Sequence, residues 1–194
     1  MLELIIATKN NHKVYEIESI LKGLPLKLIS LLDLKDVPKI IENKKTFEGN
    51  ALKKARIISK KFNELVMADD SGLEVKALDG KPGVKSARFA GPNPTPEKLC
   101  HKLLRVMGQG SRVAQFVCCV AIVFPDGKEK VLKGICRGKI IRDMRGKNGF
   151  GYDPVFVPAG YKKTFAEMSS LMKNRLSHRG RAFRKAKIAL KSAL

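Results

Sequence analysis

Two adjacent carboxylates, Asp69 and Asp70, follow the apolar run 65–68 and precede Ser71 and Gly72. This pattern predicts a short buried strand that stops at the acids, and strand ends are where α/β folds usually build sites. Neighbouring carboxylates repel each other, so a cation is needed to keep both ionised. Mg²⁺ suits such a corner because it binds through one or two carboxylates and substrate phosphates. Glu42 is a candidate third oxygen ligand, and a plain Asp-Ser-Gly turn is the alternative.

A polar segment between a predicted strand and a predicted helix reads Thr8-Lys9-Asn10-Asn11-His12-Lys13. Free N–H groups at a helix start attract anions, and Lys13 adds a positive charge in the first turn. The segment lacks the glycines of a Walker loop, so it is not a P-loop. It indicates anion binding, with an ordinary strand-to-helix turn as the alternative.

Two further segments carry polar and aromatic groups, Gly149-Phe150-Gly151-Tyr152-Asp153-Pro154 and Lys173 with Ser177-His178-Arg179. The two glycines let the backbone approach a flat ligand, and Phe150 or Tyr152 can stack on a base. Asp153 can accept a hydrogen bond from a base or hold the loop. Arg179 can bind phosphate or point donors at a carbonyl oxygen. A tight loop and a core or surface histidine are the structural alternatives.

An alternation of strands and helices must position these residues. Apolar runs predict strands at 2–7, 26–32, 65–68, 113–124 and 131–141, and apolar stripes predict helices after 10–11, from 46 to about 62, from 96 and from about 179. Residues 79–96 and 146–151 read as loops. We expect an α/β fold, a single domain over residues 1–194 with two lobes, in which helices flank a long curved mixed β-sheet around a central cleft.

The formal net charge of +21 over 194 residues indicates an anionic partner, although a basic surface can also serve solubility alone. No apolar run approaches the ~20 residues of a membrane span, so we expect no membrane partner. The N-terminus has no basic start before its apolar segment and does not read as a signal peptide. The four cysteines form no CxxC pair, which favours reduced core thiols in a cytoplasmic protein.

Six motifs occur in one order along the chain: Thr8-x-Asn10-x-x-Lys13, Thr46-Phe47-x-x-Asn50-Ala51-x-x-Lys54-Ala55, Ala68-Asp69-Asp70-Ser71-Gly72-Leu73, Pro82-Gly83-x-x-Ser86-Ala87-Arg88, Gly149-Phe150-Gly151-Tyr152-Asp153-Pro154 and Ser177-His178-Arg179. Together they closely resemble the inosine/xanthosine triphosphate pyrophosphatase family. These enzymes remove deaminated purine nucleoside triphosphates. The resemblance extends from the first strand to the C-terminal helix.

The resemblance implies a role for each matching residue. Asp70 corresponds to the family's proton acceptor and Mg²⁺ ligand, Glu42 to its second metal-side acid, and Asp69 can support the metal through water. Ser71 is expected to contact the substrate. The other implied substrate contacts are Thr8, Lys9, Asn10, Asn11, His12 and Lys13 at the triphosphate, Phe150, Gly151, Tyr152 and Asp153 around the base, and Lys173, His178 and Arg179 at the 6-keto oxygen or a phosphate.

The implied activity is Mg²⁺-dependent hydrolysis of ITP, dITP and XTP to the monophosphate and pyrophosphate, by a cytoplasmic homodimer. Two positions depart from the family pattern: Lys44 stands where a glycine is common, and Gly49 where many relatives carry glutamate. The alternative from another class is a basic nucleic-acid-binding module, because the chain beyond Glu167 carries only basic charges. No nucleic-acid-binding motif supports it, so a nucleic-acid partner is not expected. A related pyrophosphatase with another base preference is a nearer alternative.

Overall fold

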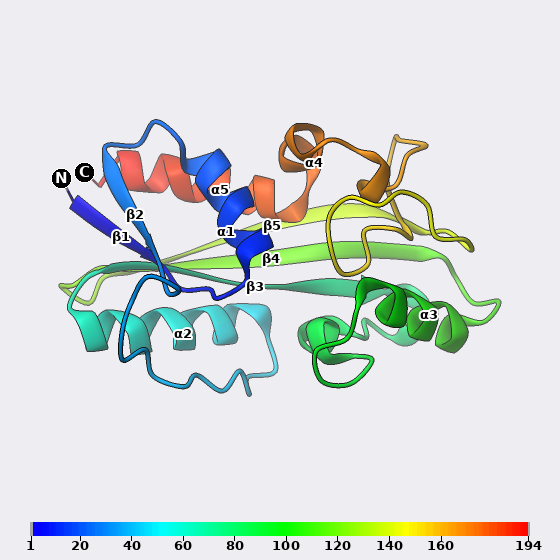
Figure 1. The fold of residues 1–194 in the computed structure, drawn as a ribbon, viewed down its shortest axis with the longest axis horizontal. Helices are drawn as coiled ribbons and strands as arrows, with labels where there is room; N and C mark the ends of the chain where they lie inside the picture. Colours follow the sequence, from blue (N-terminus) through cyan, green and yellow to red (C-terminus); the bar gives the residue numbers. More distant parts are fainter. Residues whose placement is uncertain (1, 194) are drawn as a thin grey trace. The chain divides into compact units, whose positions relative to one another are not determined.

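The computed structural model describes residues 2–193. The predicted domain span of 1–194 includes two terminal residues, Met1 and Leu194, that lie outside this range. The elements are β1 Leu2–Ile6, α1 Asn11–Leu21, β2 Leu26–Ser30, α2 Phe47–Phe62, β3 Leu65–Val75, α3 Pro96–Met107, β4 Val113–Val123, β5 Glu129–Ile140, β6 Phe156–Pro158, α4 Ser170–Leu176 and α5 His178–Lys191 (Figure 1).

The strands form a six-stranded sheet in the order β2-β1-β3-β4-β5-β6. β1 pairs in parallel with β2 and with β3, whereas β5 and β6 are antiparallel. The predicted α/β class with a mixed sheet flanked by helices is therefore confirmed.

The chain divides into two compact units, in line with the two predicted lobes. The first unit contains residues 1–70, 118–134 and 179–194, and the second contains 71–117 and 135–178. The chain passes from one unit to the other within β3, β4 and β5 and at the start of α5. The central cleft and the single domain stay predictions.

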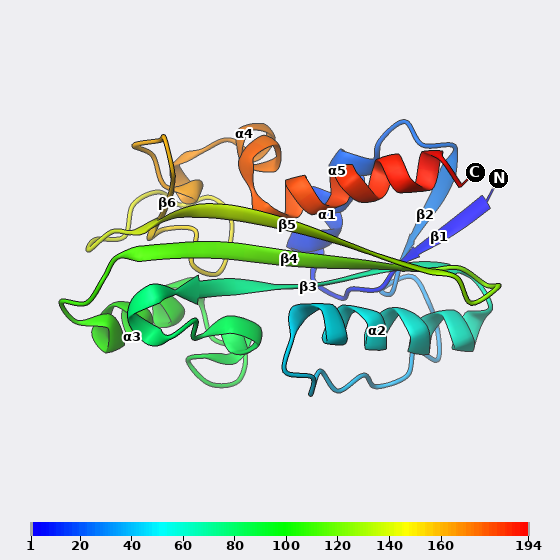
Figure 2. The same ribbon diagram turned by 180° about the vertical axis from the view of Figure 1, so that it is seen from behind.

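In the first unit, strand alternation separates two apolar faces. Leu4 and Ile6 of β1 pack with the buried residues of α1 and α5, while Ile5 and Ala7 pack with those of α2. α2 lies on one side of these strands, and α1 and α5 lie on the other (Figures 1 and 2). Because successive side chains of a strand point to opposite faces, this two-sided cover determines where the functional side chains point.

The second unit has its own core, built on aromatic residues. Phe116 of β4 packs edge-on against Phe156 with ring centroids 4.8 Å apart, and it stacks on Phe165 at 6.0 Å. Leu99 and Leu103 of α3 are buried in the same cluster, as predicted from their spacing. Val106, predicted on that face, is instead 43% exposed.

The prediction that the third strand stops at the acids is wrong. β3 continues through Asp69 and Asp70 to Val75, and the Asp-Ser-Gly sequence makes no turn. Two apolar residues of this continuation, Leu73 and Val75, are fully buried. β6 and α4 were not predicted because three residues and seven residues are too few to carry a periodic pattern.

The other boundaries agree well with prediction. Asn10, Thr46 and Thr95 cap α1, α2 and α3 through their side-chain oxygens, and Pro96 occupies the first turn of α3. Between residues 2 and 193, none of the helices is long and apolar enough to cross a bilayer. All four cysteines are buried free thiols, as expected.

Candidate active site

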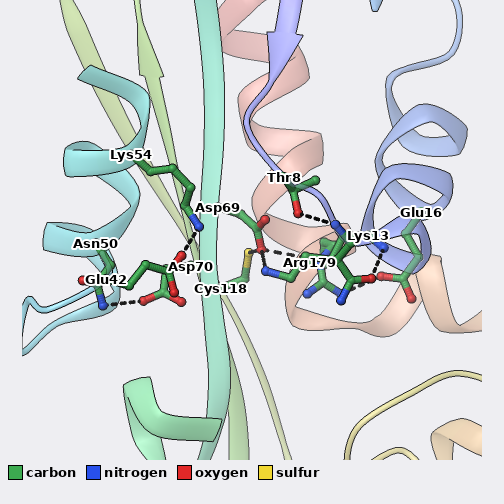
Figure 3. A network of polar contacts seen from close by, with 11 residues as sticks. Thr8, Lys13, Glu16, Glu42, Asn50, Lys54, Asp69, Asp70, Cys118 and Arg179 are labelled. Atoms are coloured by element: carbon green, nitrogen blue, oxygen red, sulfur yellow. Dashed lines mark hydrogen bonds and ion pairs between the residues drawn. The ribbon is translucent and has the colours of Figure 1, made fainter. Parts of the chain in front are cut away.

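Asp69 and Asp70 point to opposite faces of β3, which corrects the predicted shared corner (Figure 3). Asp69 lies on the face of α1 and α5, and Asp70 on the face of α2. Both residues are buried, with 2% and 6% of their surface exposed. Their mutual repulsion is therefore relieved by separation across the strand, and each acid has its own hydrogen-bond partners.

Asp70 lies among polar groups of α2 and the segment before it. Asn50 donates from Nδ2 to Asp70 Oδ2 at 2.9 Å, and Lys54 donates to Glu42. Burial raises the pKa of Asp70 to about 6, against the hydrogen bond from Asn50, and the charge of Glu42 adds to the rise. Asp70 therefore changes protonation close to neutral pH, as a general acid–base group should.

Asn50 also fixes the segment that carries Glu42. Its side-chain oxygen accepts from Lys44 N at 2.8 Å, and its Nδ2 donates to Lys44 O at 3.3 Å. The two departures from the family pattern meet here, since a Cβ on Gly49 would lie 3.1 Å from Lys44 Cβ and 3.0 Å from Thr46 Oγ1. A larger residue at position 49 would crowd this segment.

Sequence reasoning assigned no role to Asn50 and Lys54, although both appear in the second motif. They are buried at positions four residues apart, beside Ala51 and Ala55 on the buried stripe of α2. Burial would lower the pKa of the Lys54 amine, but the carboxylates of Asp69, Glu42 and Asp70 outweigh this effect and raise it. The sequence did offer a sign of their role, because Asn50 and Lys54 are polar residues on an otherwise apolar helical stripe.

On the other face, Asp69 is held by two cations. Lys13 donates from Nζ to Asp69 Oδ2 at 2.8 Å, and Arg179 Nε lies 3.7 Å from the same oxygen. Burial alone would raise the pKa of Asp69, but the charges of Lys13, Arg179 and Lys54 hold it well below its usual range. Arg179 also donates from Nη1 to Glu16 Oε2 at 2.6 Å, a buried partner that the sequence analysis missed.

The predicted phosphate segment forms the start of α1. Thr8 Oγ1 accepts from Asn10 N at 3.2 Å, and Asn10 Oδ1 in turn accepts from Lys13 N at 3.2 Å. Thr8 is buried, whereas Lys9, Asn10, Asn11 and His12 are exposed. The structure brings Lys13 to Asp69, and the predicted triphosphate contacts of this segment stay predictions.

In the second unit, Asp153 organises the glycine-containing loop. It accepts from Phe150 N at 2.8 Å and from Lys173 Nζ at 2.7 Å, both at Oδ2. Lys173 Nζ also lies 4.6 Å from the centroid of the Phe150 ring. A Cβ on Gly149, which has φ +78°, would lie 2.0 Å from Asp153 Oδ2, so only glycine fits. Of the two roles predicted for Asp153, the structure supports holding the loop.

Two predicted base contacts have buried side chains with structural partners. Tyr152 is 2% exposed and donates from its hydroxyl to Ser86 O at 2.9 Å, so its ring does not stack on a base and Phe150 is the remaining candidate. His178 stacks on Phe116, with centroids 4.6 Å apart and planes at 10°. Ser71 is half-buried. Substrate contacts by His178, Ser71 and Gly151 stay predictions.

Comparison with known proteins places this arrangement in a family. The model of the Ham1 family matches residues 4–189. The chain is 45% identical over 190 residues to a dITP/XTP pyrophosphatase of Bacillus cereus, covering 95% of this chain and 93% of that protein. It is 46% identical over 185 residues to a dITP/XTP pyrophosphatase of Desulfotalea psychrophila, covering 95% and 83%.

Comparison with solved structures indicates the same family. A HAM1 protein from Coxiella burnetii matches with a TM-score of 0.90 and 37% identity, and the Staphylococcus aureus Ham1 protein with 0.90 and 39%. Each match covers 99% of this chain and 100% of the other. The motifs, the fold and these matches agree, and the chain belongs to the Ham1 family.

Proposed function

We propose that this chain is a nucleoside triphosphate pyrophosphatase that hydrolyses ITP, dITP and XTP between the α and β phosphates. The products are the nucleoside monophosphate and pyrophosphate. Curated relatives that cover nearly the whole chain carry the name dITP/XTP pyrophosphatase, which supports this substrate class. The homodimer and the cytoplasmic location implied by the family resemblance remain predictions.

The observation that carries the proposal is the environment of Asp70. Its carboxylate is buried beside Glu42 and Asn50, and in the metal-free site its pKa of about 6 lets it accept a proton near neutral pH. We assign it the role of orienting and deprotonating the attacking water, a contribution of typically ~10²–10⁴-fold to the rate.

The donor set fits Mg²⁺. The charge of Glu42 raises the pKa of Asp70, and Mg²⁺ would relieve this repulsion in addition to Lys54, which donates to Glu42. Within residues 2–193, no group of three or more His, Cys, Asp or Glu side chains that could hold a metal ion occurs, so the proposed site has two protein carboxylates. Mg²⁺ bound by Asp70, Glu42 and substrate phosphates would neutralise charge on the phosphate oxygens.

The phosphates are proposed to bind at the start of α1. An ammonium has three N–H donors, so the bond from Lys13 to Asp69 is compatible with a further contact to phosphate. The helix start and Lys13 both favour negative charge on the leaving pyrophosphate. In the second unit, the Phe150 ring and Lys173 supply a stacking surface and a cation for the base.

Selectivity is proposed to rest on purine positions 6 and 1. Hypoxanthine and xanthine offer a 6-keto acceptor and an N1–H donor, whereas adenine offers the reverse. A site whose buried donors face position 6 rejects adenine by ~10⁴-fold or more. The role of Arg179 at the 6-keto oxygen remains a prediction, and its Nη1 and Nε already interact with Glu16 and Asp69.

The test is pyrophosphate release from ITP, dITP, XTP, ATP and GTP, with Mg²⁺ and with a chelator. We expect strong release from the first three, weak release from ATP, and none without metal. Guanine shares the 6-keto and N1–H groups, so the expected weak release from GTP requires that its 2-amino group is excluded. Equal release from all five would refute the purine selectivity, and no release from any would refute the enzymatic proposal.

The nucleic-acid alternative is weakened by how the basic C-terminal residues are used. Lys173 and Arg179 are buried in ion pairs, and Lys187 Nζ donates to the carbonyls of Ile20 and Lys22. These three cations serve the fold, which leaves fewer of the basic C-terminal residues to contact a phosphate backbone.

A further inference from the structure

Four buried or half-buried charged side chains in the first unit form a chain of ion pairs that starts and ends on α1, and we call it the ring because the α1 backbone joins its two ends (Figure 3). Lys13 and Glu16 are three residues apart and therefore project from one face of α1. Lys13 binds Asp69 of β3 at 2.8 Å, and Glu16 binds Arg179 of α5 at 2.6 Å. Arg179 Nε lies 3.7 Å from Asp69 Oδ2 and so joins the two ion pairs.

The ring alternates in charge and is nearly excluded from water. The side chains of Asp69, Arg179 and Glu16 are 1%, 2% and 9% exposed, and that of Lys13 is 16% exposed. A buried charge is tolerated when it is paired and hydrogen-bonded, so each member depends on its neighbours for its place. Lys13 is the most exposed member and the one on the predicted phosphate segment.

We infer that Asp69 and Glu16 are positioning residues that hold Lys13 in place for the phosphates of the substrate. Asp69 acts directly, by fixing one donor direction of the Lys13 ammonium. Glu16 acts through Arg179, which shares the Asp69 carboxylate with Lys13. This inference rests on the proposed function and assigns neither acid a contact with the substrate.

The ring also links the phosphate segment to the proposed catalytic acid. Asp69 precedes Asp70 on β3, and the side chains point to opposite faces. A contact that fixes Asp69 against α1 therefore fixes the strand position of Asp70 relative to Lys13. Misplacing a catalytic group by about 1 Å can reduce the rate by ~10²-fold.

The test measures binding of inorganic pyrophosphate, which has phosphates but no base, by calorimetry with Mg²⁺. The variants are Asp69→Asn and Glu16→Gln, each checked for folding by thermal melting first. Glu18→Gln is the matched control, because Glu18 is exposed on the same helix. We expect Asp69→Asn to weaken binding on the order of tenfold, the scale of a charge-assisted hydrogen bond. Glu16→Gln should weaken it less, and Glu18→Gln should leave it unchanged.

A double-mutant cycle separates positioning from a general structural effect. In a Lys13→Met background the phosphate contact is gone, so Glu16→Gln should cause no further loss of pyrophosphate affinity. The same loss in both backgrounds, or no loss in either, overturns the inference. If Asp69→Asn does not fold, the Glu16 cycle decides alone.

The outcome is distinguishable from failure of the proposed function. A wild-type chain that binds pyrophosphate but hydrolyses no nucleotide refutes the function, while the cycle still tests the ring. A wild-type chain that binds no pyrophosphate overturns the inference.

Discussion

Replacing Asp70 by asparagine should make the chain more stable while removing its turnover. The pKa of Asp70 rises from 3.8 to about 6 on folding, chiefly through burial. The folded chain therefore holds a proton that the unfolded chain has released between these two values. In that window stability falls as pH rises, and above about pH 6 the full penalty of the buried charge is present.

The size of the penalty follows from the shift. Two pK units at about 1.4 kcal/mol each give about 3 kcal/mol near pH 7.5, in the absence of metal. Asparagine keeps an oxygen that can accept from Asn50 but adds a buried N–H donor group, which offsets part of the gain. We expect Asp70→Asn to raise the free energy of unfolding by about 1–3 kcal/mol near pH 7.5 and by less than about 1 kcal/mol near pH 4.

The assay is urea unfolding of both proteins in a metal chelator at the two pH values. Asp69→Asn is the matched control, because Asp69 is the neighbouring residue on the opposite face of β3. The pKa of Asp69 is lowered by Lys13 and Arg179, so its contribution to stability is present above about pH 4 and lost as pH falls further. Replacing Asp69 by asparagine should lower the free energy of unfolding by about 3–5 kcal/mol. A destabilised Asp70→Asn, or a gain of equal size at both pH values, would refute the reasoning.

Three further expectations concern the loop and the pH profile. Gly149→Ala should destabilise the chain by about 1–3 kcal/mol more than Gly151→Ala in urea unfolding, because both have positive φ but only the first clashes with Asp153; equal losses would contradict this. Lys173→Met leaves the Asp153 carboxylate buried without its cation and should cost about 3–5 kcal/mol, and a cost below about 1 kcal/mol would argue against the pair. At limiting Mg²⁺, kcat/KM should fall about tenfold per pH unit below about pH 6, as deprotonated Asp70 is lost; a flat profile to about pH 4.5 would exclude Asp70 as the base.

Much of the local structure could be predicted because local chemistry determines it. The caps Asn10, Thr46 and Thr95 and the buried stripes that follow them set the starts of three helices. The ordered motifs indicated the family, which the comparisons confirm. The main error was β3, where turn-forming residues Ser71 and Gly72 lie inside a strand, since pairing within a sheet overrides local preference.

By itself, the sequence determined most of the element types and the family, because periodicity, capping and motifs can be read along the chain. Only the tertiary structure decided how the charges are shared. Because β3 continues as a strand, Asp69 and Asp70 face opposite sides and belong to different networks. Glu16 and Arg179 are 163 positions apart, and no local pattern indicates that each is the other's buried counter-ion. Pairing of this kind depends on which helices cover which face of the sheet, and that is settled only when the core packs.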